Sequence, residues 1–282
     1  MQFTFDREYQ LQVKQKKISV IEWGDPDLPA VLCMHGWLDN AASFHYLAPY
    51  LKHKYRLIAF EVPGHGQSEH LSVDADYQFV SGLSTIDAVL NTLNIEQCQV
   101  IGHSMGGALA LLYAGVVSDR FSKLALIDSL GALTTPAQDT VKQLSEAIED
   151  RRKVRGNKRY FPDLESAAKA REQVSELDWQ TLYPLIERGV MRTLKGFQWS
   201  SDARLKQASW LRMTEEQHDA ILQQVKAKVL LLMAKSGLIR QFPYQRRLAN
   251  IADHELIEVE GGHHFHMQYP EETAHLIQQF LD

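Results

Sequence analysis

The sequence feature that most constrains this chain is a short motif with glycine at each end and serine at its centre, Gly102-His103-Ser104-Met105-Gly106. An apolar run at residues 99–101 precedes it, and an apolar run of good helix formers follows at residues 108–113. A serine on a sharp turn between a strand and a helix has a strained backbone, so it needs small residues on both sides. The motif therefore predicts a strand, a tight turn and a helix, with Ser104 at the turn.

This turn makes Ser104 a candidate nucleophile. It would lift the hydroxyl above the sheet and place the amide of Met105 at a helix N-terminus, where it can face a developing negative charge. The alternative is an ordinary glycine-rich turn between a strand and a helix. Gly107 extends the patch of small residues and favours the nucleophile.

Length and composition indicate a globular protein without extreme charge. The 282 residues suffice for one large α/β domain or for a domain with an insertion. A net charge of −5 argues against nucleic acid as a partner, and the lack of a long apolar run argues against a membrane span. The N-terminus does not have the pattern of a signal peptide. Cys33 and Cys98 each fall in an apolar strand, where we expect buried thiols without a disulfide. We therefore predict a cytoplasmic location.

The order of predicted elements indicates a doubly wound sheet. Residues 9–13 and 18–23 alternate apolar and polar side chains, which predicts an antiparallel hairpin at a sheet edge. Strands and helices then alternate up to Asp128, which is typical of parallel strands with crossover helices. The strands are expected at residues 30–34, 55–60, 99–103 and 121–127, and helices near residues 42–51, 73–93 and 108–113.

Residues 130–226 interrupt this alternation. The stretch is rich in charge, has no run typical of a strand, and contains three prolines expected to divide it into short helices, Pro136, Pro162 and Pro184. Its leucine, isoleucine and tryptophan residues predict apolar helix faces. Alternation resumes with strands at residues 228–233 and 255–259 and helices at residues 242–251 and 271–280. We therefore expect a core domain of residues 1–129 and 227–282, with a helical cap at residues 130–226.

A serine hydroxyl is a weak nucleophile, and it needs a base that a third group orients. The run Gly261-Gly262-His263-His264-Phe265-His266 follows the last predicted strand. A histidine on such a turn can reach across the carboxyl edge of the sheet. The residues alone leave all three histidines as candidates.

Four motifs at predicted strand ends resemble those of the α/β-hydrolase superfamily, over nearly the whole chain. They are His35-Gly36, the run at residues 63–68, Gly102-His103-Ser104-Met105-Gly106-Gly107, and the run at residues 262–270. The run at residues 35–44 is most similar to the branch called serine hydrolase-like proteins. The resemblance implies an α/β-hydrolase fold, with a mostly parallel doubly wound sheet, an N-terminal antiparallel hairpin and a helical cap insertion.

The resemblance also implies the roles of individual residues. In the family the catalytic histidine precedes a proline by seven residues, which selects His263 before Pro270 rather than His264. The family's usual acid lies in a Gly-x-x-Asp turn, but this chain reads Ala234-Lys235-Ser236-Gly237 there. Some members carry the acid at the end of the preceding strand, where this chain has Asp128. The alternative role for Asp128 is to cap a following helix.

Two backbone amides are expected to form the oxyanion hole, that of Trp37 and that of Met105. The Trp37 side chain is predicted to line the acyl pocket. His103, beside the nucleophile, is a candidate for substrate contact or for local packing. Asp39 and Asn40 are candidates for substrate binding or for a helix N-cap. We expect structural roles for His35, Glu61, His65, His264 and His266.

The sequence thus predicts a serine hydrolase that cleaves a carboxylic ester of a small or medium apolar substrate without a metal or organic cofactor. A serine nucleophile argues against a dehalogenase or an epoxide hydrolase. Two alternatives remain: a thioesterase, amidase or carbon–carbon hydrolase with the same triad, and a non-catalytic ligand-binding member. The basic run at residues 151–159 either attracts an anionic substrate or is a solvated helix face. A monomer and a homodimer are both compatible with the sequence.

Overall fold

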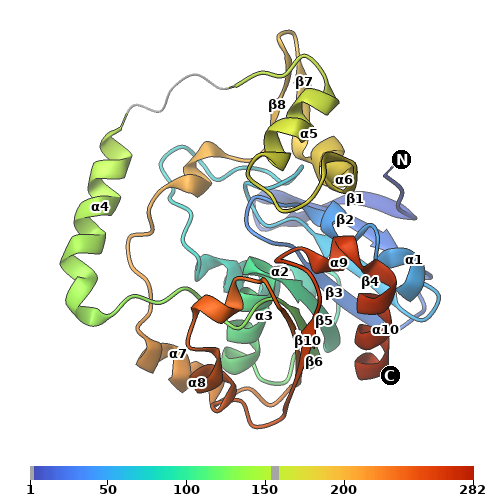
Figure 1. Cartoon of the computed structure of the whole chain (residues 1–282), viewed down its shortest axis with the longest axis vertical. Helices are drawn as coiled ribbons and strands as arrows, with labels where there is room; N and C mark the ends of the chain where they lie inside the picture. The colour runs from blue at the N-terminus through green and yellow to red at the C-terminus, as the bar shows by residue number, and fades with distance from the viewer. Residues whose placement is uncertain (1–2, 154–158) are drawn as a thin grey trace.

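The computed structural model describes residues 3–153 and 159–282, and its centre is an eight-stranded sheet (Figure 1). The strand order is β1-β2-β4-β3-β5-β6-β9-β10. Strands β1 (Arg7–Val13), β2 (Lys16–Trp23) and β4 (Arg56–Phe60) pair antiparallel. The other pairs are parallel and add β3 (Ala30–Met34), β5 (Cys98–His103), β6 (Phe121–Ile127), β9 (Lys228–Ala234) and β10 (His254–Val259). The predicted doubly wound sheet with an N-terminal hairpin is confirmed.

Helices cover both faces of the sheet, as the continuous apolar strands require. One face packs against α2 (Ser81–Thr92), α3 (Met105–Val116), α7 (Glu215–Leu222) and α8 (Tyr244–Leu248). The other packs against the short helices η1 (Ala41–Phe44) and α1 (Ala48–Leu51) and against α10 (Pro270–Leu281). Cys33 and Cys98 are free and buried, as predicted. Among the described residues, no helix combines the length and apolar character that crossing a membrane requires.

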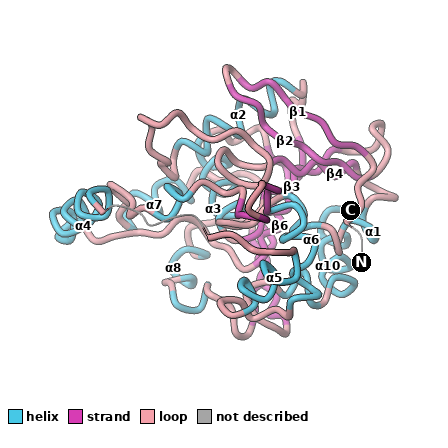
Figure 2. The backbone as a smooth tube through the Cα atoms, turned by 90° about the horizontal axis from the view of Figure 1, so that it is seen from above, coloured by secondary structure: helices cyan, strands magenta, loops and turns pink. Residues whose placement is uncertain are grey.

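Above the carboxyl ends of the strands lies the inserted segment. Its helices α5 (Leu164–Glu172) and α6 (Trp179–Gly189) share an apolar cluster with the hairpin of β7 (Val190–Thr193) and β8 (Gly196–Trp199). The segment also includes η2 (Ala137–Asp139), η3 (Ala203–Lys206) and α4 (Thr140–Arg152). Helix α4 lies at the margin of the molecule, away from α5 and α6 (Figure 2).

The hairpin corrects the expectation that the insertion has no strands. Strand β7 has only four residues and two of them are exposed, so it shows no alternating pattern. The turn depends on Gly196, whose φ of +112° suits glycine. Helix α7 also differs from the expected boundary at residue 226. It packs on α3, and Leu222 belongs to the main core, so residues 215–222 lie with the core.

Two predicted helix boundaries are wrong for identifiable reasons. Pro184 lies inside α6 instead of ending it, and the Tyr46 hydroxyl donates a 3.4 Å hydrogen bond to the Gln180 carbonyl that the missing proline amide leaves free. Helix α2 begins at Ser81 rather than near residue 73. The carbonyls of residues 71, 72 and 75 accept hydrogen bonds from Arg204 of the insertion instead of from a helix.

Candidate active site

Ser104 occupies the turn between β5 and α3, with φ +50° and ψ −118°. This conformation is strained for a residue with a side chain. The flanking glycines are required by close approach: a Cβ on Gly102 would overlap Gly107, and a Cβ on Gly106 would overlap the Met34 carbonyl at the end of β3. The small residues of the motif therefore let α3 start directly against the sheet, with Ser104 partly buried at its edge.

Ser104, His263 and Asp128, which follow three separate strands, form one hydrogen-bonded chain. His263, in the loop after β10, has its Nε2 atom 2.8 Å from Ser104 Oγ. Its Nδ1 atom lies 2.6 Å from Oδ2 of Asp128, which follows β6. The strands β5, β6, β9 and β10 are successive neighbours, so their carboxyl ends bring these residues to one rim. Of the three histidines in the cluster, the structure brings His263 to the serine.

The carboxylate of Asp128 is buried and held by the loop after β9. Oδ1 accepts a 3.3 Å hydrogen bond from the amide of Ala234, and Oδ2 accepts a 2.8 Å bond from the amide of Leu238. Asp128 does not cap a helix, because the next helix begins only at Ala137. A Cβ on Gly237 would overlap this carboxylate. Asp128 therefore fills the space in which an acid at position 237 would place its side chain.

The two predicted oxyanion amides belong to Trp37 and Met105, close in sequence to the point where the end of β3 contacts α3. Met105 begins α3, and an amide in the first helical turn has no acceptor within the helix. Trp37 lies just after β3, whose end touches the same helix at Gly106. The Trp37 side chain is half exposed, and its indole nitrogen donates a 3.2 Å hydrogen bond to the Leu205 carbonyl in the insertion. The oxyanion roles stay predictions.

His103 is buried beneath Ser104 and His263 and is not exposed at the surface where a substrate would bind. Its side chain is fully buried, and its Nε2 atom lies 3.0 Å from the carbonyl of His263. Its ring packs 4.4 to 4.8 Å from those of His263, His264 and His266. Burial and the neighbouring imidazoles hold the pKa of His103 well below its usual value. The predicted substrate contact is therefore corrected to local packing that supports the histidine loop.

A chain of ion pairs ties the insertion to the histidine loop. Asp39 Oδ2 lies 3.2 Å from Nε2 of His264, and Asp39 Oδ1 lies 3.1 Å from the guanidinium of Arg171 in α5. Glu176, between α5 and α6, accepts a 2.7 Å hydrogen bond from the amide of His264. Asp39 therefore pairs with cations instead of capping a helix, and Asn40 provides the cap of η1.

This arrangement predicts a loss of stability at alkaline pH. Burial lowers the pKa of His264, but the Asp39 and Glu176 carboxylates outweigh it and raise that pKa to about 9. Because the folded pKa lies above the unfolded value, the stabilisation is complete below about pH 6.5 and disappears as pH rises through about 9. We expect the free energy of unfolding to fall by on the order of 2 kcal/mol between about pH 7 and pH 10 in urea titrations. His264→Gln should remove most of this fall, and an unchanged fall would contradict the assignment.

A second buried contact fixes α6 to the core. The Arg188 guanidinium donates to Glu61 Oε1 at 2.6 Å, to Glu8 at 2.7 Å and to the Ser19 hydroxyl at 2.9 Å. Both Arg188 and Glu61 are almost fully buried. Sequence reasoning missed Arg188 and Arg171, because nothing local in the sequence pairs a cation of the insertion with a carboxylate more than a hundred positions away. It also missed Glu176, whose partner His264 lies 88 positions away.

Fold and site together define a class of protein, and comparison with known sequences agrees. The pattern of the α/β hydrolase fold family matches residues 29–270, and this chain belongs to that family. Among its relatives is a serine hydrolase-like protein of Danio rerio, 30% identical over 97% of this chain and 88% of the relative. Serine hydrolase-like protein 2 of Homo sapiens is 28% identical over 97% of this chain and 93% of its own length. The chain is thus an α/β hydrolase of the serine hydrolase-like branch.

Solved structures agree with this placement. A hypothetical protein from Pseudomonas aeruginosa PAO1 superposes with a TM-score of 0.88 at 32% identity, covering 97% of this chain and 96% of that chain. A thioesterase domain from the curacin biosynthetic pathway superposes with a TM-score of 0.85 at 27% identity, covering 97% of this chain and 99% of that domain.

Proposed function

We propose that this chain hydrolyses a carboxylic ester through an acyl-enzyme intermediate formed on Ser104. The observation that carries the proposal is the pair of hydrogen bonds made by His263, 2.8 Å to the Ser104 hydroxyl and 2.6 Å to the Asp128 carboxylate. A hydroxyl, an imidazole and a buried carboxylate in this order make a serine nucleophilic on many unrelated folds.

In the first half of the reaction, Ser104 Oγ attacks the carbonyl carbon while Nε2 of His263 accepts its proton. Asp128 accepts a hydrogen bond from Nδ1–H, keeps Nε2 free as the acceptor and stabilises the imidazolium. The amides of Trp37 and Met105 would bind the oxyanion. His263 then returns the proton to the leaving alkoxide as the bond between the carbonyl carbon and the alcohol oxygen breaks.

In the second half, water attacks the acyl group on Ser104. His263 accepts a proton from the water and then donates it to Ser104 Oγ as the acid leaves. The atoms of one ester and one water are thus converted into one acid and one alcohol, with no additional reactant.

Thioester hydrolysis is the second candidate. The 27% identity to a thioesterase domain favours it, and the same three residues would perform the same steps on a sulfur leaving group. A non-catalytic binding role is less consistent with the site, because the acid absent at Gly237 has a replacement in Asp128.

A fluorophosphonate probe tests the nucleophile directly. We expect the folded protein to react rapidly and the adduct to map by mass spectrometry to the peptide that contains Ser104, because this hydroxyl donates a hydrogen bond to Nε2 of His263 and is thereby activated. Heat-denatured protein is the control and should not react. A folded protein that stays unlabelled, or that is labelled at another serine, would exclude the proposed mechanism.

A further inference from the structure

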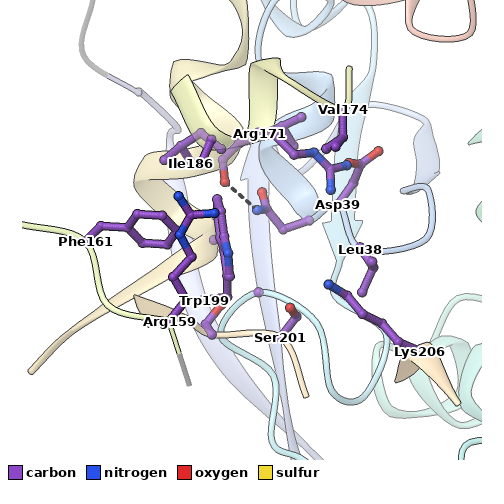
Figure 3. Close-up of a pocket in the computed structure, with 16 residues that line it drawn as sticks. Leu38, Asp39, Arg159, Phe161, Arg171, Val174, Ile186, Trp199, Ser201 and Lys206 are labelled. Atoms are coloured by element: carbon purple, nitrogen blue, oxygen red, sulfur yellow. Dashed lines mark hydrogen bonds and ion pairs between the residues drawn. The ribbon is translucent and has the colours of Figure 1, made fainter. Parts of the chain in front are cut away.

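A cavity of about 190 Å³ lies between the insertion and the loop after β3 (Figure 3). Part of its wall is apolar: Phe161 and Trp199 pack edge to face with ring centroids 5.3 Å apart, and Ile186 lies on the same side. Such a wall suits a short hydrocarbon chain.

Three cationic side chains approach the same cavity from different segments, as Figure 3 shows. Arg171 belongs to α5, Lys206 ends η3, and Arg159 precedes α5 with its guanidinium 5.0 Å from the centroid of the Phe161 ring. Among the described residues, neither Lys206 nor Arg159 forms an ion pair with a carboxylate. Both residues are exposed, so their side chains can turn toward a ligand.

The negative charge of the cavity wall is already neutralised by neighbouring cations. Asp39 is the only acidic residue among the described residues that line the cavity. It pairs with Arg171 at 3.1 Å and with His264 at 3.2 Å, and Glu176 in turn pairs with His264. With His264 protonated, these four groups sum to zero. Lys206 and Arg159 then leave an excess of two positive charges in a partly enclosed site, which attracts anions.

The loop after β3 connects the cavity with Trp37, one of the two proposed oxyanion donors. The Trp37 indole contacts the carbonyl of Leu205. Leu38 follows Trp37 in the sequence and Lys206 follows Leu205, and both Leu38 and Lys206 line the cavity. With the oxyanion role proposed above for the Trp37 amide, a substrate carbonyl at Ser104 would lie beside Trp37, and the rest of the substrate could extend into this space.

We propose that this cavity binds an anionic oxygen group of the substrate, a carboxylate, sulfate or phosphate at the end of a short apolar chain, with Lys206 and Arg159 as its cationic partners. The inference rests on the proposed function and narrows its substrate class. It also modifies the expectation of a purely apolar substrate, because the apolar wall of the cavity carries cations at its edge. Arginine and lysine form their strongest hydrogen bonds with such oxyanions.

The test compares two esters of equal length, the p-nitrophenyl monoester of adipic acid and p-nitrophenyl hexanoate, which differ only in the terminal carboxylate. We expect kcat/KM to be at least about tenfold higher for the adipate ester, as one charge-assisted hydrogen bond would produce. Lys206→Met should lower this selectivity ratio at least about threefold, and Lys206→Met with Arg159→Gln should abolish it. Lys142→Met, an exposed cation on α4, is the matched control and should leave the ratio intact.

A second arm asks whether the anion lies on the leaving group. Hexanoyl-coenzyme A, which carries phosphates, is compared with hexanoyl-N-acetylcysteamine, which carries none. Selectivity in either arm that depends on Lys206 supports the proposal and assigns the anion to the acyl or the thiol side. Equal rates in both arms would overturn it, while hydrolysis of all four compounds would leave the proposed function intact.

If the protein hydrolyses none of these compounds, a binding measurement tests the anion site independently of the proposed hydrolase activity. Calorimetry on Ser104→Ala compares monomethyl adipate with methyl hexanoate, and we expect at least about tenfold tighter binding of the anion, weakened by Lys206→Met. This result without turnover in the wild type would support the anion site and reject the proposed function. Equal binding of the two esters would reject the anion site.

Discussion

Ser104→Ala is expected to lower kcat/KM for p-nitrophenyl hexanoate by about 10⁴- to 10⁶-fold, because the variant lacks the hydroxyl on which we propose that the acyl-enzyme forms. Alanine keeps the Cβ and therefore the turn, so the site should otherwise retain its geometry. The melting temperature should not fall, since the lost hydroxyl belongs to the site and not to the core.

The matched control is Ser84→Ala on α2, where the hydroxyl donates only to the Ser81 carbonyl. Its activity should stay within about twofold of the wild type, as for a surface substitution away from the site. A Ser104→Ala protein that retains a tenth of the wild-type rate would show that another group performs the reaction.

The turn that carries Ser104 could be predicted from sequence because its constraints are local. Gly102 and Gly106 allow the strand, turn and helix to approach one another within a few residues of Ser104, and the structure has β5 ending at His103 and α3 beginning at Met105. His263 could be chosen among three adjacent histidines only through a spacing to Pro270 that the resemblance implied. Nothing in the residues themselves separates His263 from His264.

The insertion was the least predictable region, because its structure depends on contacts that are distant in sequence. Arg171 meets Asp39 across 132 positions, and Arg188 meets Glu61 across 127. Arg204 occupies the carbonyls of the loop before α2 and so shortens a helix predicted from local periodicity. The burial of His103 follows from three other imidazoles packed around it, which no sequence pattern reports.

Asp128 could be predicted in part, because both local sequence and distant contacts determine its place. The absence of an acid after β9 directed attention to the end of β6, but only the neighbouring positions of these two strands in the sheet explain why that end can serve. Its backbone φ of +41° is a conformation that favours glycine, and the Ala234 and Leu238 amides fix the carboxylate. The strain is stored at a site where it positions a functional group.

Asp128→Asn is expected to lower kcat by about 10³- to 10⁴-fold, comparable to the loss from the equivalent change in trypsin-like enzymes. Both carboxylate oxygens accept hydrogen bonds, from Ala234 and from Leu238 with His263. An amide group must therefore face one donor with its own NH₂. If it faces His263, the imidazole proton moves to Nε2, and the ring can no longer accept the Ser104 proton. Steady-state kinetics with p-nitrophenyl hexanoate measures the loss, and a change of less than tenfold would remove Asp128 from the mechanism.

Moving the carboxylate from position 128 to position 237 tests the role of Asp128 most sharply. Gly237 does not have the positive φ that favours glycine, so the Asp128 carboxylate is what prevents a side chain there. Gly237→Asp alone should lose activity and stability, because two carboxyl groups compete for one space.

Asp128→Gly alone should be as inactive as Asp128→Asn, while its melting temperature shows whether the backbone strain is relieved. The double variant, Asp128→Gly with Gly237→Asp, should recover at least about a hundredfold over Asp128→Gly, since an orienting carboxylate returns to His263. A folded double variant no more active than Asp128→Gly would show that the acid must come from β6 and that the vacancy at Gly237 has another cause.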